Sequence, residues 1–431
     1  MQTDLAANKI REDGLMNILV VAYACEPFAS SEPGVGWNFL KEISKFSRVW
    51  VVTRSNNKPA IDKAAASGMG TLAGRITWIY VDLPTWVTRI KNKIPLGTQA
   101  YYSLWQWWAL AVCRRIQQTV KFDLVHHLTF GVTWLAPVIF FLGIPFVWGP
   151  IGGGDLVPGK IMKRESIRSR IQENLYVILS RWICRISPLA RLARRRASAI
   201  LFRTSSTERV FPATRTLQRL VLCETATSDE IKLRTNQNEG TIKAVCVGRM
   251  QYWKGFRYAI EGFHRFLKMN GEGTLIFLGE GPEFGVIQRY RRENNLEQNV
   301  LLPGRVPFAE VQRVLCQSNV LIHPSFRDGG SWAVLEGMAN GLPVICVDYS
   351  GSADMVTETS GIRVSADDPE GVTNGIAGAL MTLYREPELR TTLGVGAQER
   401  VNTYYRWNSK GEQIREVYAK ILGDIQPSDC P

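Results

Sequence analysis

Residues 320–348 read VLIHPSFRDGGSWAVLEGMANGLPVICVD. An apolar run at each end of this stretch flanks a glycine-containing loop and a segment long enough for a short helix. Short continuous apolar runs are typical of strands that are buried on both faces of a parallel sheet. A strand, a crossover helix and a second strand make the unit from which such sheets are built. The stretch therefore predicts a parallel α/β sheet.

The same alternation of strands and helices occurs twice in the 431 residues, a length that exceeds what one core usually serves. It begins at MNILVVAYA (16–24), ends at AILFRT (199–204) and restarts at TIKAVCVGR (241–249). We expect an α/β protein with two doubly wound, Rossmann-like domains that face a cleft, covering 16–205 and 241–400. The polar residues 206–240 are predicted to link them. Ligands of such sheets bind at the carboxyl ends of the strands.

Positive charge is concentrated in the first half of the chain. Residues 1–205 hold 27 Lys and Arg against 12 Asp and Glu, whereas the remainder is nearly balanced. The densest segment, 160–196, has eleven basic and two acidic residues. Its apolar residues recur at helical spacing, which favours an amphipathic helix at an anionic membrane surface. A solvated face on an ordinary core helix explains the same pattern. A basic face also suits nucleic acid, although we expect no nucleic-acid partner.

Several features of the sequence indicate the cellular compartment of the protein. They are the cysteines, the uncharged windows and the N-terminal residues. The eight cysteines are scattered without a CxxC pair, which fits a reducing compartment and predicts neither a disulfide framework nor a zinc site. Residues 1–16 contain charges where a signal peptide has an apolar core. Residues 128–154 lack charge but hold prolines and glycines, so we predict a buried helix near 131–142 and then a strand. The aromatic window 94–113 suits a membrane interface better than a bilayer centre. We expect a cytoplasmic protein, with peripheral attachment to the inner membrane face.

Loops at the predicted strand ends of the second domain gather polar residues. Arg249 and Lys254 stand beside a helix start, and Asp328 and Glu336 bracket a loop that enters a helix. Glycines at a helix entrance let backbone N–H groups approach an anion, and the helix dipole adds to that attraction. Arg249 and Lys254 would neutralise a diphosphate. Glu336 would accept two ribose hydroxyls, and Asp328 would accept hydroxyls of a sugar ring.

Four motifs in this order, strand-GR-x4-KG, LGEGPE, GRVPFAEV and HPSFRDGGSWAVLEGMANGLPVICVDYSG, resemble the donor-binding domain of retaining glycosyltransferases of family 4, which have the GT-B fold. YACEPFASSEPGVGW further resembles a bacterial subgroup associated with exopolysaccharide. The resemblance implies a nucleotide-sugar donor, a lipid-linked or oligosaccharide acceptor and a helix at 405–422 that packs back on the first domain. The catalytic residues that it implies are Arg249, Lys254, Asp328 and His127 or His126. The donor-binding residues that it implies are Glu336, Gly329, Gly330, Ser331, Gly34, Gly36 and Gly281.

Three departures from the family pattern matter for the site. The first acid is Asp328, where Glu is usual, and the small apolar run after it is replaced by Gly329, Gly330, Ser331 and Trp332. His126 and His127 are adjacent, so both are candidates to contact the sugar; His127 lies nearer the end of its strand.

Other classes of protein compete with this interpretation. No GxGxxG follows the first strand, which argues against a nicotinamide dehydrogenase. A GT-B nucleotide-sugar epimerase and a non-catalytic basic protein that binds membrane or nucleic acid are the alternatives. The sequence shows neither HExxH nor a carboxylate pair spaced as a DxD metal clamp, so we predict a transferase without metal and without a cofactor other than its donor substrate.

Overall fold

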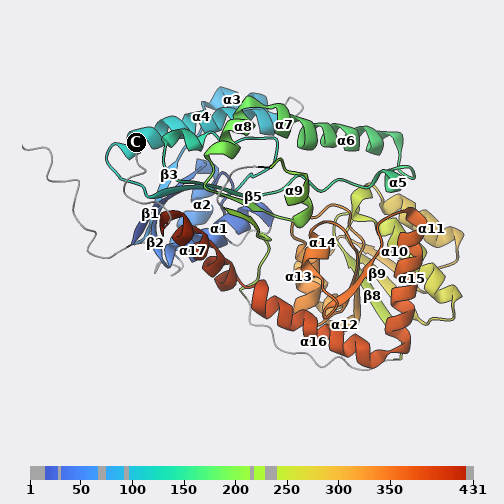
Figure 1. The fold of residues 1–431 in the computed structure, drawn as a ribbon. Helices are drawn as coiled ribbons and strands as arrows, with labels where there is room; N and C mark the ends of the chain where they lie inside the picture. Colours follow the sequence, from blue (N-terminus) through green and yellow to red (C-terminus); the bar gives the residue numbers. More distant parts are fainter. Residues whose placement is uncertain are drawn as a thin grey trace, which may run out of the picture.

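The computed structural model describes residues 15–27, 31–66, 74–91, 97–213, 218–228 and 240–423. They form two parallel sheets with helices on both faces of each, as predicted (Figure 1). The first sheet has seven strands in the order β3-β2-β1-β4-β5-β6-β7. Its strands are β1 (Met16–Val21), β2 (Ser47–Thr53), β3 (Ile76–Tyr80), β4 (Leu124–His127), β5 (Phe146–Ile151), β6 (Ala199–Phe202) and β7 (Gln218–Val221).

The second sheet has six strands in the order β10-β9-β8-β11-β12-β13. Its strands are β8 (Ile242–Val247), β9 (Gly273–Leu278), β10 (Val300–Gly304), β11 (Val320–His323), β12 (Val344–Val347) and β13 (Gly361–Val364). All four residues of β11 and of β12 are buried, which explains the unbroken apolar runs in the sequence. The opening stretch of the sequence is therefore the strand-helix-strand unit β11-α13-β12.

Helices cover both faces of the first sheet. One apolar core lies between the sheet and α1 (Ser31–Ser44), α2 (Lys58–Ala66) and α17 (Trp407–Gly423), and a second core lies under α4 (Gly97–Gln117) and α8 (Pro188–Arg196). Further helical segments of this domain include α3 (Thr85–Lys91), α5 (Gly159–Met162), α6 (Ile167–Val177), the π-helix η4 (Ile178–Ile183), α7 (Cys184–Ile186) and α9 (Ser205–Val210).

The second sheet is enclosed in the same way. Its helices are α10 (Phe256–Lys268), α11 (Phe284–Glu293), α12 (Phe308–Gln317), α13 (Trp332–Ala339), α14 (Ser350–Met355), α15 (Pro369–Arg385) and α16 (Pro387–Tyr404). After α16 the chain returns to the first domain, where α17 buries Trp407, Tyr418 and Ile421 against the core that contains α1 (Figure 1). The helix expected at 405–422 corresponds to α17.

Two local expectations differ from the structure. The segment predicted as a linker, 206–240, contains α9 and β7, and β7 pairs with β6 as the last strand of the first sheet. β7 is an edge strand, which is covered on one side only, and its sequence pattern is therefore weak. The helix predicted near 131–142 is also wrong. That stretch forms a bridge between Val132 and Gly152 and a 3-10 turn, η3 (Ile139–Leu142), because Pro137 lacks the N–H that a continuous helix requires.

Strand order creates one switch point in each sheet, where neighbouring strands are followed by connections that run in opposite directions. These points lie between β1 and β4 in the first sheet and between β8 and β11 in the second. The loops after such strand pairs diverge and leave a crevice, which is where open α/β sheets bind ligands. The loops after β8 and β11 carry Arg249, Lys254 and Asp328.

No signal peptide is expected in residues 1–16. Apart from Leu15 and Met16, these residues lie outside the described part of the chain.

Candidate active site at the interdomain cleft

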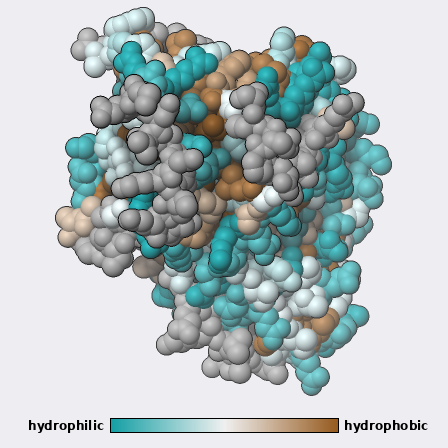
Figure 2. All heavy atoms as spheres, turned by 60° about the vertical axis from the view of Figure 1, so that its left-hand side comes forward, coloured by the Kyte–Doolittle hydropathy of each residue, from teal (hydrophilic) through white to brown (hydrophobic). Residues whose placement is uncertain are grey.

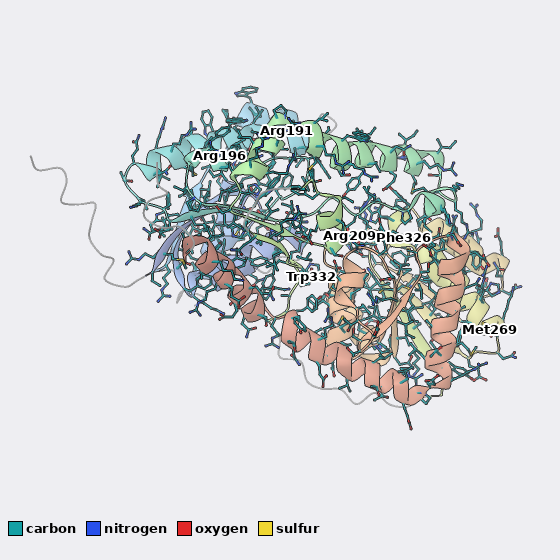
Figure 3. The ribbon with its side chains drawn as sticks, in the orientation of Figure 1. Arg191, Arg196, Arg209, Met269, Phe326 and Trp332 are labelled. Atoms are coloured by element: carbon teal, nitrogen blue, oxygen red, sulfur yellow. The ribbon has the colours of Figure 1, made fainter. Side chains whose placement is uncertain are left out.

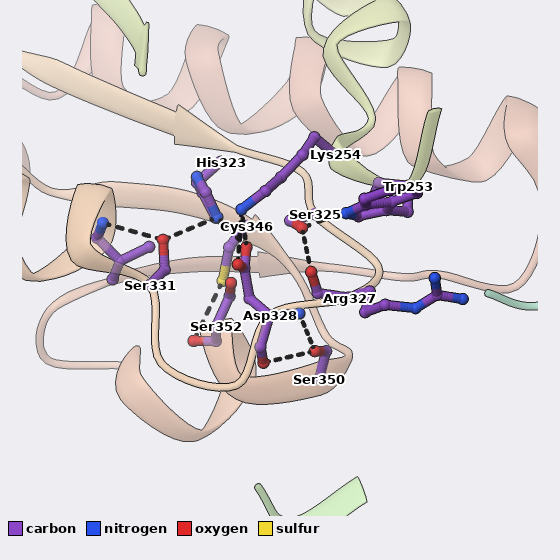
Figure 4. Close-up of polar contacts among 11 residues, drawn as sticks. Trp253, Lys254, His323, Ser325, Arg327, Asp328, Ser331, Cys346, Ser350 and Ser352 are labelled. Atoms are coloured by element: carbon purple, nitrogen blue, oxygen red, sulfur yellow. Dashed lines mark hydrogen bonds and ion pairs between the residues drawn. The ribbon is translucent and has the colours of Figure 1, made fainter. Parts of the chain in front are cut away.

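Lys254 and Asp328 meet at the switch point of the second sheet. The Lys254 Nζ lies 2.6 Å from Asp328 Oδ1 and 2.8 Å from Oδ2 (Figure 4). Gly255 makes this approach feasible, since it adopts a φ of 67° and a Cβ there would lie 2.2 Å from the carbonyl oxygen of Pro324. Burial alone would raise the pKa of Asp328, but Lys254 and His323 outweigh it and hold that pKa well below its usual range.

His323 completes this charged group, although the sequence pattern left its role open. It ends β11, and its Nε2 lies 2.7 Å from Asp328 Oδ2 and 3.1 Å from the hydroxyl of Ser331. Because a carboxylate only accepts, Nε2 carries the proton and donates it to Asp328. Burial lowers the pKa of His323, and the Asp328 carboxylate opposes that shift. The signal available in the sequence was the position of His323 at a strand end, five residues before Asp328.

The backbone of Asp328 is fixed by the start of α14. Its N–H donates to the Ser350 hydroxyl at 2.8 Å, and its carbonyl accepts from that hydroxyl and from the Gly351 N–H, both at 2.9 Å. The loop that follows ends at Ser331, which caps α13 by accepting from the Val334 N–H at 3.4 Å. The carboxylate at 328 is thus held at both its side chain and its backbone.

Glu336 stands apart from this group. It lies on α13, half-buried, and its carboxylate has neither a hydrogen bond nor an ion pair with any residue that the structure describes. Burial raises the pKa of Glu336 to about 7. A carboxylate that is partly withdrawn from water and lacks a partner is a candidate to accept hydroxyls from a ligand. The two acids of the opening stretch therefore differ in their pairing, since the Asp328 carboxylate forms an ion pair and the Glu336 carboxylate does not.

Arg249 and Gly281 belong to the loops on the β10 side of the crevice. The Arg249 side chain is exposed, and within the described part of the chain no acidic or carbonyl partner is found for it. Gly281 has a φ of 157°, and a Cβ there would lie 2.4 Å from the carbonyl oxygen of Met250. The loop after β9 is thus packed directly against the loop that carries Arg249. Arg249 is not brought into contact with Asp328 or Glu336.

In the first domain, the two glycines predicted to bind the donor lie in the first two turns of α1. Gly34 and Gly36 are both buried, and a Cβ at Gly36 would lie 2.4 Å from the carbonyl oxygen of Ala24 and 2.9 Å from the Thr129 methyl group. Ala24 follows β1 and Thr129 follows β4, so Gly36 lets the helix enter the switch point of the first sheet. Close packing is the role that the structure gives this glycine.

The two histidines of β4 point to opposite faces of the sheet. His126 Nδ1 lies 2.6 Å from the Tyr418 hydroxyl of α17 and its Nε2 lies 2.6 Å from the Gly149 carbonyl, so both ring nitrogens are satisfied. His127 Nε2 lies 2.5 Å from the Tyr102 hydroxyl, and its Nδ1 has no hydrogen-bond partner among the described residues. Burial lowers the pKa of His126 to about 4 and that of His127 to about 3. Of the two, only His127 keeps a ring nitrogen for a further contact.

The glycines after Asp328 lie against the first domain. A Cβ at Gly329 would lie 3.2 Å from the Arg203 side chain, and one at Gly330 would lie 2.3 Å from the Thr225 hydroxyl. Arg203 is itself paired with Glu32 at 2.9 Å and Glu224 at 2.8 Å. Burial raises the pKa of Glu224 to about 7, against the attraction of Arg203. This cluster of Arg203, Glu32 and Glu224 faces the donor loop and was missed in the sequence, where nothing links its members.

Trp332, one of the residues that depart from the family pattern, lies between the two domains (Figure 3). It packs against the core that contains α1 and also against a core of the second domain. A separate cavity of about 580 Å³ lies between α5, α6 and Tyr349, which directly precedes Ser350. Its lining residues include Lys163, Arg181 and Glu173. The lining contains neither Lys254, Asp328 nor Glu336, so this cavity is not the place where those three side chains lie.

Comparisons with known proteins agree with this architecture. Across 94% of this chain and all of the other, the structure resembles the Anabaena protein HepE in complex with UDP, with a TM-score of 0.59 and 13% identity. It resembles sucrose-phosphate synthase from Thermosynechococcus elongatus over 95% of this chain and all of the other, with a TM-score of 0.58 and 17% identity. The fold is the two-domain GT-B architecture.

Sequence similarity to a known family lies mainly in the second domain. Residues 227–400 match the family model of Glycosyl transferases group 1, and this match spans the second domain. An uncharacterized glycosyltransferase of Methanocaldococcus jannaschii is 24% identical over 42% of this chain and 46% of its own length. A 2-deoxystreptamine glucosyltransferase of Streptomyces kanamyceticus is 23% identical over 62% of this chain and 70% of its own. The chain spans about half the length of the first of these relatives.

The described residues contain neither a metal-binding cluster nor a membrane-spanning helix. No three His, Cys, Asp or Glu side chains gather as a metal site within the described ranges. In the same ranges, each helix is too short or too polar to cross a bilayer.

Proposed function

We propose that the protein is a retaining glycosyltransferase of the family 4 type. It transfers a sugar from a nucleotide-diphosphate sugar to a lipid-linked or polysaccharide acceptor at the cytoplasmic face of the membrane. The observation that carries the proposal is the Lys254–Asp328–His323 group at the switch point between β8 and β11, the position where a GT-B donor domain meets its ligand. The group 1 family match over the same loops supports it.

The Lys254–Asp328 pair suggests how the donor is received. Without donor, the ammonium of Lys254 neutralises the carboxylate of Asp328. A diphosphate placed at Lys254 and the exposed Arg249 competes for that ammonium, and the oxygens of Asp328 then become acceptors for sugar hydroxyls. His323 keeps Asp328 in place during the exchange. When the bond between the anomeric carbon and the diphosphate oxygen breaks, Lys254 and Arg249 stabilise the charge that develops on the leaving group.

Metal-independent transfer follows from the same assignment, because the two cations supply the charge that a divalent ion supplies in other transferases. Glu336 would bind the ribose through its unpaired carboxylate. The acceptor hydroxyl would attack the anomeric carbon from the face that the leaving group vacates and would pass its proton to the departing diphosphate oxygen, which gives retention of configuration. Among the two histidines, His127 is the candidate for sugar contact because one of its ring nitrogens lacks a partner.

A membrane-proximal acceptor is supported by the surface of the first domain. Exposed apolar side chains occur on α3, α4 and α6, beside exposed arginines of α8 such as Arg191 and Arg196 (Figure 3). Figure 2 shows apolar atoms among hydrophilic ones on the upper part of one face of the molecule. Basic residues next to exposed aromatic and aliphatic side chains are typical of surfaces that bind anionic bilayers.

Thermal unfolding with a panel of UDP, GDP and their sugars tests the donor assignment. A nucleotide at 100 times its dissociation constant adds ~2.7 kcal/mol to the free energy of unfolding. We expect one diphosphate family to stabilise the wild-type protein and to lose most of its effect in Glu336→Ala. Incubation of the stabilising sugar nucleotide without acceptor, followed by product analysis, separates a transferase from an epimerase. A protein that responds to none of the nucleotides would refute the proposal.

A further inference from the structure

Helix α6 and its continuation through η4 and α7 expose a continuous apolar stripe. The residues of this stripe are 50% to 76% exposed and recur every three or four positions: Ile167, Ile171, Leu175, Ile178, Trp182 and Ile186. This spacing places them along one side of the helix. A surface helix normally turns its apolar side inward, so an exposed apolar stripe indicates an interaction surface.

The charges beside the stripe select the chemistry of that partner. Lys163, Arg168, Arg181 and Arg185 are exposed, and none of them pairs with a carboxylate within the described ranges. The helices α3 and α4, whose exposed side chains include Trp86 and three large residues of α4, lie on the same upper side of the first domain as α6–α8 (Figure 1). Apolar side chains flanked by unpaired cations complement an anionic lipid bilayer, whose headgroups attract the cations while the boundary below them takes up the apolar groups.

The buried side of α6 holds a single carboxylate, Glu173, which is 3% exposed. It accepts a hydrogen bond from the Val157 N–H at 3.0 Å and one from the Tyr252 hydroxyl at 2.8 Å. It also forms an ion pair with the Arg327 guanidinium. Glu173 belongs to the first domain, whereas Tyr252 and Arg327 belong to the second. This one side chain therefore joins α6 to two loops of the donor domain.

Those two loops are the ones that carry the proposed catalytic pair. Tyr252 lies two residues before Lys254 in η5 (Tyr252–Lys254), and Arg327 lies directly before Asp328. Arg327 is held further by the Asp155 carbonyl, to which its Nε donates at 3.0 Å, and by the ring of Tyr176, whose centroid lies 3.9 Å from the guanidinium carbon. Tyr176 is also on α6. The positions of both Lys254 and Asp328 therefore depend on the position of α6.

We propose that α6 couples membrane binding to the donor site: the stripe docks on an anionic lipid surface, and Glu173 acts as a positioning residue that then holds the Tyr252–Lys254 and Arg327–Asp328 loops in place. This inference rests on the proposed function for the meaning of the Lys254–Asp328 pair. Docking restricts the motion of a helix whose outer face has no other support. Restricting α6 lowers the rate at which the two loops open, because local opening depends on the contacts that must break.

Hydrogen exchange of the full chain, with and without vesicles, tests the coupling directly and needs no nucleotide. The probes are vesicles of phosphatidylglycerol and phosphatidylcholine, with pure phosphatidylcholine as the charge control. We expect the anionic vesicles to slow exchange at residues 252–254 and 327–331 of the wild-type protein by about five-fold, the lower end of ordinary coupling between sites. Glu173→Gln should bind the same vesicles but show no slowing, since it keeps the acceptor oxygen and loses the ion pair. Glu173→Asp should restore part of the slowing.

Variants of the stripe separate docking from folding. Ile171→Ser with Trp182→Ser should lose vesicle binding and the slowing at both loops, while its exchange in buffer stays that of the wild type. Phe308→Ser, which changes a side chain that is 67% exposed on the second domain, is the matched control and should behave as wild type. The inference would be overturned if the wild-type protein did not bind anionic vesicles. It would also be overturned if the vesicles slowed hydrogen exchange in Glu173→Gln as much as in the wild type. A concentration-dependent dimer that protects the stripe would overturn it too, because it would assign the stripe to a second copy. Failure to bind UDP or GDP, with the exchange result intact, would refute the proposed function alone.

Discussion

The ammonium of Lys254 and the carboxylate of Asp328, 74 residues apart in the chain, lie 2.6 Å from each other in the cleft. Each is mostly buried, with 18% and 13% of its side chain exposed. Withdrawing one partner would leave the other charge in a poorly solvated position. The pair therefore stabilises the two loops as well as placing the groups that we propose to act on the donor.

Lys254→Met should lower both stability and turnover. Asp328 would keep its hydrogen bond from His323 but lose its ion pair in a partly buried position, which costs ~3 kcal/mol. A lost electrostatic contact to the leaving group costs about 10²–10³ in turnover. Urea unfolding and donor hydrolysis or transfer assays measure the two effects. The double variant Lys254→Met with Asp328→Asn should recover part of the stability and none of the turnover. Unchanged stability in Lys254→Met would show that the ion pair contributes nothing to folding.

Arg249→Ala should separate the same two effects. Its side chain is exposed and has no partner in the described part of the protein, so its removal should leave the free energy of unfolding within about 0.5 kcal/mol of the wild type. If Arg249 binds the donor diphosphate, turnover still falls by about 10²-fold. Arg249→Lys should keep part of the activity. Full turnover in Arg249→Ala would remove this residue from the site.

Glu336 should make stability and nucleotide affinity depend on pH in opposite directions. Burial raises the pKa of Glu336 to about 7 in the folded protein, above its ordinary value of 4.5. The folded state therefore binds the proton more tightly, so the stability contributed by this group is present below pH ~4.5 and is lost as the pH rises through about 7. Nucleotide affinity should rise over the same interval, because the ionised carboxylate accepts hydroxyls better. Calorimetry at pH 6 and 8 on wild type and Glu336→Gln measures both, and equal pH dependence in the two proteins would contradict the assignment.

Gly330→Ala should weaken the contact between the domains. The new methyl group would lie 2.3 Å from the Thr225 hydroxyl and 2.7 Å from the Cys223 sulfur, so the residues at this contact between the domains must move apart. Overpacking of this kind costs ~1–3 kcal/mol. Gly378→Ala is the matched control, because it lies in α15 with no atom within 4 Å of its new methyl group, and it should be neutral or stabilising. Equal melting temperatures for the two variants would show that the contact between the domains accommodates the extra methyl group.

His126→Ala should destabilise the protein without a specific loss of catalysis. The substitution leaves the buried Tyr418 hydroxyl of α17 without its partner, which costs ~1–3 kcal/mol. Because the pKa of His126 is lowered to about 4, its contribution to stability is present above pH ~6.5 and is lost as the pH falls towards 4. Acid unfolding of the wild type and of His126→Ala should therefore converge at low pH. A fall in turnover at full stability would instead give His126 a place in the site.

Much of the fold could be predicted because its signals are local. The buried runs at β11 and β12 are continuous in the sequence, and the loops that end them follow directly, so the βαβ unit and its polar loops were predicted correctly. The edge strand β7 and the irregular stretch 131–142 were not, because an edge strand carries a weak pattern and prolines allow several non-helical conformations. The roles of Arg249, Lys254, Asp328 and Glu336 toward a donor stay predictions.

The sequence by itself determined that two parallel α/β domains exist and that Lys254 and Asp328 stand in loops at their strand ends, since periodicity and glycine placement are properties of neighbouring residues. Only the tertiary structure decided that these two residues pair, that His126 is satisfied by Tyr418, and that Glu173 of the basic helix α6 reaches Tyr252 and Arg327. Those contacts join residues tens to hundreds of positions apart. They depend on how the two domains pack, and no local pattern in the chain records that.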